Sequence, residues 1–333
     1  MKMDIKAADV AKLRQMTGAG MMDCKKALVE AEGDFKRAQE IIREKGKLVA
    51  AKRADRETSE GAVIAKVNGD KAILVCLGCE TDFVSKNAEF QALAEAIAEA
   101  AIAAFPADLE ALKACTLADG RTVEAAVTEQ TGKTGEKHVI VAYETVQAPY
   151  ISAYIHKING KLGSLVGFNK AFDEQVAKGV AMQVASMNPV AVSADVVPQS
   201  VIDNELKTAT EKTKEELVKK AVDAALTKAG INPAHVDSEA HIESNQAKGW
   251  ITAEQAEQAR QIIKTVSEEK AANLPEQMVA NIAKGRLQKF FKEQTLEEQG
   301  YQMLDGKTPV KDVIKAADKE AKVLVFKRIS LAD

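Results

Sequence analysis

Two long stretches rich in Ala, Glu and Lys, residues 199–229 and 253–294, most constrain how this chain can fold. Both contain strong helix formers and apolar residues at helical spacing, although Pro275 interrupts the second stretch. Residues 231–252 lie between them as an excursion without a sustained period. We therefore expect a protruding antiparallel helical hairpin or coiled coil over residues 206–294. Its charged faces are either solvated or recognised by a partner, and spacing alone leaves both readings open.

The rest of the chain mixes strands with shorter helices. Residues 61–77 predict a β-hairpin, because Val63, Ala65 and Val67 alternate before Asn68-Gly69-Asp70, which suits a tight turn, and a continuous apolar run, 72–77, follows it as a buried strand. Further strands are predicted near 137–147, 150–158, 162–168 and 322–329, with Asn159-Gly160 as a turn, and helices near 85–104, 108–117, 121–130, 173–188 and 309–317. The last strand is long enough to rejoin a sheet.

Residues 4–47 predict three short helices, which stop at Thr17-Gly18-Ala19-Gly20 and at Gly33. Asp34 is expected to cap the third helix. The charged segment that follows has no apolar period and predicts a linker.

The fold class is therefore α+β, with antiparallel sheets. The expected domains are a three-helix N-terminal domain (1–47), a linker (48–60), the N-terminal half of a core (61–148), its C-terminal half (149–205 and 295–333) and the helical insertion (206–294).

Charge and composition argue against several protein classes. The net charge of −3 lacks the basic excess typical of a direct nucleic-acid binder. No apolar run approaches the length of a membrane span, and Met1-Lys2-Met3-Asp4-Ile5-Lys6 lacks the apolar segment of a secretory signal. We therefore expect a cytoplasmic protein without membrane contact.

The sequence predicts no metal site. Cys76 and Cys79 have the spacing of a zinc or redox pair, but residues i and i+3 of a strand point to opposite faces. No second such pair occurs, and the four histidines show no supporting spacing. Free thiols are expected.

No catalytic or cofactor motif is complete, so we expect no enzyme and no cofactor. Gly132-Lys133-Thr134 resembles the end of a phosphate-binding loop, but Val127 stands where that motif needs glycine. A flexible turn is expected there. No nucleophile is paired with a base at a known local spacing. Catalytic groups can also lie far apart in sequence, so this argument lowers the case for an enzyme without excluding one.

Thr81-Asp82-Phe83-Val84 places a large apolar residue in a short loop between a predicted buried strand and a helix. Phe83 either folds back and seals the end of the core, or stands out as a wedge for a partner protein. Aromatic anchors often contribute much of the binding energy of an interface.

Met21-Met22 follows a glycine turn and presents a similar choice. The two side chains either pack inside the small bundle or contact a partner, whose irregular surface methionine can fit.

Several segments, in order along the chain, resemble bacterial elongation factor Ts. Residues 17–28, TGAGMMDCKKAL, and 79–84, CETDFV, resemble its two signatures. Three further segments resemble its C-terminal core half and coiled coil: 154–166, 181–189 and 274–290. The match spans nearly the whole chain.

The resemblance implies a guanine-nucleotide exchange factor for the GTPase elongation factor Tu, active in translation elongation. It implies a ubiquitin-associated-like N-terminal domain, a two-part core and a coiled coil. Thr81, Asp82, Phe83 and Val84 would enter the partner near its magnesium and nucleotide. Gly18, Gly20, Met21 and Met22 would dock on the same partner domain. His156, Gly160 and Gly163, in the C-terminal core half, would touch another partner domain.

Three features depart from the family pattern. Residues 208–270 exceed a short coiled coil, so that arm is expected to be enlarged. Gln183 replaces a histidine found in some relatives, which puts a partner contact there in doubt. The sequence ends at Asp333, so contacts of the extra C-terminal module of some relatives are expected to be absent.

Two rivals to an exchange factor remain: a non-catalytic scaffold with a helical arm, and an enzyme with a convergent polar pocket. The oligomeric state is open, so a homodimer of the exchange factor stays among the partners to be tested.

Overall fold

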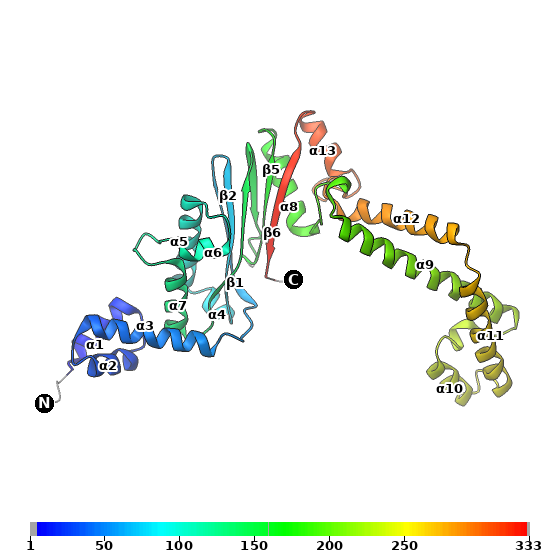
Figure 1. The fold of residues 1–333 in the computed structure, drawn as a ribbon, viewed down its shortest axis with the longest axis horizontal. Helices are drawn as coiled ribbons and strands as arrows, with labels where there is room; N and C mark the ends of the chain where they lie inside the picture. The colour runs from blue at the N-terminus through cyan, green and yellow to red at the C-terminus, as the bar shows by residue number, and fades with distance from the viewer. Residues whose placement is uncertain (1–4, 159, 332–333) are drawn as a thin grey trace. The chain divides into compact units, whose positions relative to one another are not determined.

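The computed structural model describes residues 5–158 and 160–331 of the chain (Figure 1). Contacts within the chain divide it into two units, Met1–Val192 with Gln299–Asp333, and Ser193–Glu298. The predicted turn residue Asn159, the first four residues and Asp333 lie outside the described residues. The fold class is α+β, as predicted, with two small antiparallel three-stranded sheets in the first unit.

The first unit begins with a three-helix bundle: α1 (Ala7–Thr17), α2 (Met21–Glu30) and α3 (Phe35–Lys52). Its small core is apolar, and its fully buried members include Leu13, Cys24, Leu28 and Ala38. Asp34 caps α3 as predicted, because its carboxylate accepts from the backbone N–H groups of Lys36 and Arg37.

The third helix corrects the prediction of where the linker starts. α3 continues to Lys52, past the predicted helix end at residue 47. Gly46 of α3 lies against Gly132 of α7 (Val123–Thr134), where a Cβ on Gly132 would come within 2.7 Å of Gly46 Cα. Close contact between two glycines therefore supports this part of α3. Because glycine has no side chain, such a contact gives no apolar periodicity in the sequence.

The first sheet has the order β1-β2-β3, formed by Glu60–Asn68, Lys71–Cys79 and Val139–Gln147. Gly69 makes the predicted hairpin turn at a φ of 61°. The sheet packs against α5 (Ala88–Ala104), and the remaining short helices of this half are α4 (Asp82–Ser85) and α6 (Leu109–Ala114). Fully buried Phe90 of α5 lies in the core between this helix and the sheet.

The two faces of β2 contribute to different cores. Cys79 lies in the cluster beneath α5, whereas Cys76 lies in the cluster that joins the two sheets. The prediction that these thiols point to opposite faces is confirmed. Burial raises the pKa of each thiol to about 12, which makes both poor nucleophiles.

The second sheet has the order β4-β5-β6, formed by Tyr150–Ile155, Leu162–Phe168 and Val323–Ser330. The C-terminal strand rejoins the sheet beside β5, as predicted. Two helices complete this half: α8 (Glu174–Met187), which Asp173 caps and left-handed Asn188 ends, and α13 (Val310–Ala317).

The second unit consists of a 30-residue helix, α9 (Gln199–Lys228), with α11 (Ala253–Ala272) and α12 (Glu276–Gln294) packed along it. Arg286 of α12 pairs with Glu216 of α9 at 2.5 Å. Short helices η1 (Ala194–Val196), η2 (Pro233–His235) and α10 (Glu239–Ala247) complete it.

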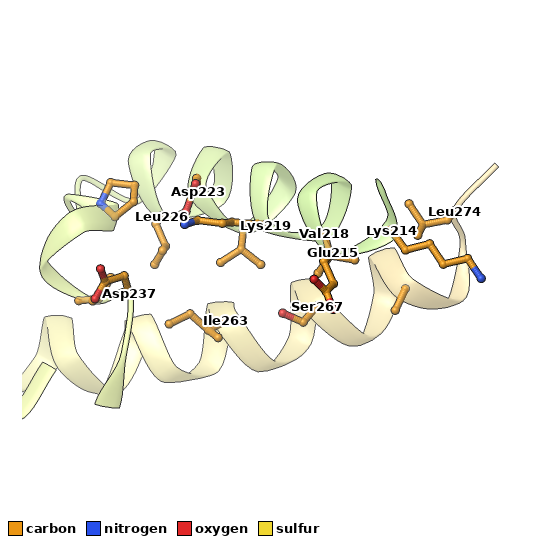
Figure 2. A pocket seen from close by; sticks show the side chains of 14 residues that line it. Lys214, Glu215, Val218, Lys219, Asp223, Leu226, Asp237, Ile263, Ser267 and Leu274 are labelled. Atoms are coloured by element: carbon orange, nitrogen blue, oxygen red, sulfur yellow. The ribbon is translucent and has the colours of Figure 1, made fainter. Parts of the chain in front are cut away.

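Residues 231–252, the predicted excursion, are folded and belong to a core of the second unit. They fold back against the ends of α9 and α11 around an apolar core, whose members include Val222, Leu226, Ile231, Val236, Ile242 and Ile251. Beside this core, α9 and α11 border an open groove of about 520 Å³, with Leu226 and Ile263 on facing walls (Figure 2). The apolar residues of the excursion are widely spaced in sequence, so periodicity did not reveal this core.

None of the helices among the described residues is both long and apolar enough to cross a membrane.

Candidate partner-binding site

Phe83 is exposed. Its segment forms a four-residue helix, α4, rather than the predicted irregular loop, and 85% of the Phe83 surface is accessible. The neighbouring Val84 packs against the core beneath α5, and Phe90 already occupies that core. The alternative in which Phe83 seals the core is therefore wrong.

Asp82 presents an anionic group beside Phe83. Its carboxylate accepts a hydrogen bond from Lys86 Nζ at 2.7 Å, and this contact lowers the pKa of Asp82 below its ordinary value. The buried Ser85 hydroxyl donates to the Asp82 carbonyl at 3.1 Å, which closes the turn. Phe83 is thus displayed on a closed turn next to a carboxylate that is ionised at neutral pH.

Thr81 precedes this turn and is held by the segment that follows α7. Its backbone N–H donates to Glu136 Oε2 at 3.1 Å, and its hydroxyl donates to Glu136 Oε1 at 2.8 Å. Thr81 is the N-cap residue of α4, yet its side chain makes no cap hydrogen bond to that helix.

Glu80 holds the same strand end from another direction. Arg53 Nη1 lies 3.0 and 2.8 Å from the two Glu80 carboxylate oxygens, and the Lys137 N–H donates to one of them at 2.6 Å. Burial raises the pKa of Glu80, but these contacts outweigh it and leave the pKa below its ordinary value. The Lys137 side chain also donates to the carbonyls of Ala54 and Arg56. The segment after α3 is therefore tied to the base of the turn.

The N-terminal bundle exposes its two adjacent methionines. Gly18 ends α1 in the left-handed region at a φ of 68°, and Gly20 is the N-cap residue of α2. Met21 and Met22 begin α2, with 43% and 64% of their surfaces exposed. The alternative in which both pack inside the bundle is wrong. A third methionine of the bundle, Met16 in the last turn of α1, is also exposed and was not predicted as part of this surface.

The turn between β4 and β5 contains two of the other predicted contact residues. The His156 N–H donates to Leu162 O at 2.8 Å, and His156 Nδ1 lies 2.9 Å from the Tyr154 hydroxyl. Gly160 has a φ of 63°, and its carbonyl accepts from the Val63 N–H of β1 at 2.8 Å.

Gly163 differs from its neighbours because it is buried. A Cβ there would lie 2.6 Å from Ile155 Cδ1 and 3.0 Å from Leu74 Cδ1. Its lack of a side chain permits close packing of the two sheets. The geometry therefore supports a packing role for Gly163, and leaves little accessible surface for the predicted partner contact.

Gln183 is also fully buried. Its side-chain NH₂ donates to Gln299 Oε1 and to the Gly300 carbonyl, both at 3.2 Å, and its oxygen accepts from the Gln302 N–H at 3.0 Å. This side chain joins α8 to the segment before α13 and presents nothing to a partner.

The segment that resembles the end of a phosphate-binding loop does not form the predicted flexible turn. Gly132-Lys133-Thr134 forms the last turn of α7 and is not a flexible turn, since the helix ends only at left-handed Gly135. Within residues 5–158 and 160–331, no group of three or more His, Cys, Asp or Glu side chains is placed to hold a metal ion.

The contacts of Glu136, Glu80 and Arg53 were not predicted from the sequence, although Glu80 lies in the 79–84 segment. Arg53 and Glu80 are 27 positions apart, and Thr81 and Glu136 are 55 apart. Charged residues are frequent throughout the chain, so no local spacing signals these pairs.

Comparisons with known proteins match most of the chain to one family. A family model described as "Elongation factor TS" matches residues 80–333. A curated relative named "Elongation factor Ts" from Phocaeicola vulgatus is 54% identical over 329 residues, which cover 99% of each chain. Relatives of the same name from Bacteroides fragilis and Christiangramia forsetii are 55% and 42% identical, with 99% and 98% of each chain covered.

Proposed function

Because the chain belongs to the elongation factor Ts family and is a translation elongation factor, we propose that it binds elongation factor Tu and promotes GDP release. The exposure of Phe83 on a turn held by hydrogen bonds carries this proposal. A large apolar side chain kept in water is stabilised when a partner covers it.

The Asp82–Phe83 pair enters the partner near its magnesium and nucleotide in this proposal. Exchange then follows from differential binding: the factor binds nucleotide-free elongation factor Tu more tightly than the GDP-bound form, so it weakens GDP binding by the same factor. No catalytic group is needed for such a coupling.

Phe83 alone cannot supply the coupling energy. A thousandfold weakening of GDP binding needs about 4 kcal/mol, at about 1.4 kcal/mol per tenfold. Burial of one phenylalanine contributes about 1.5–3 kcal/mol. In the proposal, the Met21–Met22 surface binds the same partner domain, and the turn carrying His156 and Gly160 binds another, so that several surfaces together hold the partner in its distorted state.

The test is the release of labelled GDP from elongation factor Tu with and without this protein. A large acceleration at substoichiometric amounts of the protein is expected, because an exchange factor turns over. Binding without acceleration would favour a scaffold instead, and no binding would remove the proposal.

A further inference from the structure

We propose that Glu136 is a positioning residue, which holds the Asp82–Phe83 turn in the orientation that enters the partner. This inference rests on the proposed exchange function and adds a residue from outside the turn. Glu136 lies between α7 and β3 and reaches Thr81 through both carboxylate oxygens.

The turn needs such support because α4 has only four residues. A helix this short does not hold its own shape in water. Thr81 donates its hydroxyl and its N–H to Glu136 rather than capping α4, so the entry into the turn is fixed from outside. Hydrogen bonds to a carboxylate are stronger than those to a neutral acceptor.

The backbone of Glu136 is itself held on both sides. Its N–H donates to Thr134 Oγ1 at 3.1 Å, and its carbonyl lies 2.9 Å from Nδ1 of the buried His138. The His138 N–H in turn donates to the buried Thr131 hydroxyl at 3.0 Å. These hydrogen bonds fix the backbone of Glu136, and so they restrict the position of its carboxylate.

Glu80 completes the support from the other direction through Arg53 and the Lys137 N–H. Glu80 and Thr81 are consecutive, and so are Glu136 and Lys137. Glu136 and Lys137 thus form hydrogen bonds with the adjacent residues Thr81 and Glu80. Preorganisation of this kind lowers the ordering cost of binding.

The experiment compares Glu136→Ala with wild type at saturating exchange factor. The maximal rate of stimulated GDP release is expected to fall about tenfold. The affinity for elongation factor Tu is expected to change less than about threefold, since the methionine surface and the β4–β5 turn remain. Glu136→Gln keeps one acceptor oxygen and should recover part of the rate. Glu89→Ala, an exposed carboxylate on α5 close in sequence to the turn, is the matched control and should behave as wild type.

A double-mutant cycle separates positioning from general stability. If Glu136 acts through Phe83, adding Glu136→Ala to Phe83→Ala should change the rate less than about twofold. A full tenfold loss in that background would overturn the proposal. Thr81→Val removes the hydroxyl from the other side of the contact and should lower the rate about threefold, so the test stands even if Glu136→Ala unfolds.

The outcomes also distinguish failure of the positioning role from failure of the exchange function. If wild-type protein accelerates GDP release and the Glu136 and Thr81 variants do so equally well, only the positioning role fails. If wild-type protein gives no acceleration, the exchange function fails, and the positioning role fails with it.

Discussion

The turn at residues 81–85 and the excursion at 231–252 look alike in sequence, since both are short irregular stretches with isolated apolar residues between regular elements. Their structures differ. The first exposes its aromatic side chain, whereas the second buries Ile231, Val236 and Ile242 in a core that it shares with α9 and α11. Local spacing therefore does not decide whether an isolated apolar residue is buried.

The difference depends on what already fills the neighbouring core. Beneath the turn, Phe90 and Val84 occupy the available space, and polar contacts from Glu80 and Glu136 hold the backbone. The excursion instead completes a small core with residues of α9 and α11. A small helical module buries little surface, so its aliphatic residues must pack together if it is to hold a shape.

The largest expected effect distinguishes the buried Phe90 from the exposed Phe83. Phe90→Ala should cost about 3–5 kcal/mol of unfolding free energy, because it opens a cavity in a filled core. Phe83→Ala should change stability little but strongly slow stimulated GDP release. Denaturant unfolding and the exchange assay together measure both. Normal exchange by the Phe83 variant, or a stability loss as large as that of Phe90→Ala, would sink the wedge interpretation.

The second prediction concerns the core of the excursion. Ile242→Ala should cost about 2–5 kcal/mol within the Ser193–Glu298 unit, since Ile242 is fully enclosed. GDP release should stay close to wild type, because the proposed contacts lie in the other unit. Proteolysis at residues 231–252 and the exchange rate are the measurements. Lost exchange with an intact first unit would show that the excursion takes part in partner binding.

The third prediction tests the exposed methionines of the N-terminal bundle. Changing Met21 and Met22 together to Asp should weaken partner binding about tenfold, which corresponds to about 1.4 kcal/mol. The melting curve should hardly move, because both side chains face water. Titration calorimetry with elongation factor Tu gives the affinity. If the bundle loses its helical signal, the weaker binding comes from unfolding of the bundle and not from the exposed side chains.

The smallest expected effect is a pH dependence from His138 at the base of the turn. Burial lowers the pKa of His138, and its Nε2 has no hydrogen-bond partner among the described residues. The unfolded chain therefore takes up this proton first as pH falls through the ordinary value of about 6.5, so stability decreases from there toward the folded pKa. His138→Gln should lose less stability than wild type between pH 7 and 5. Parallel curves for the two proteins would contradict this origin.

Much of the fold could be predicted because turn and capping residues mark the ends of its elements. Asn68-Gly69 marks the first hairpin, and Asp173 and Asn188 mark the ends of α8. The helical stretches around Pro275 were also predicted, because composition and breakers act within a few residues.

Other features could not be predicted because they depend on distant partners. The extension of α3 rests on contact with Gly132, and the burial of Gln183 rests on residues 299–302. Nothing near Glu136 indicates that it binds Thr81.

The sequence by itself determined the element types, the α+β class, the separation of Cys76 from Cys79 and the family membership, since these follow from periodicity, turn chemistry and motif order. Only the tertiary structure decided that Phe83 and the two methionines face outward, that Gly163 and Gln183 face inward, and that Glu136 grips the turn. Exposure and long-range hydrogen bonds depend on which groups compete for the same space, and that competition involves residues far apart in the chain.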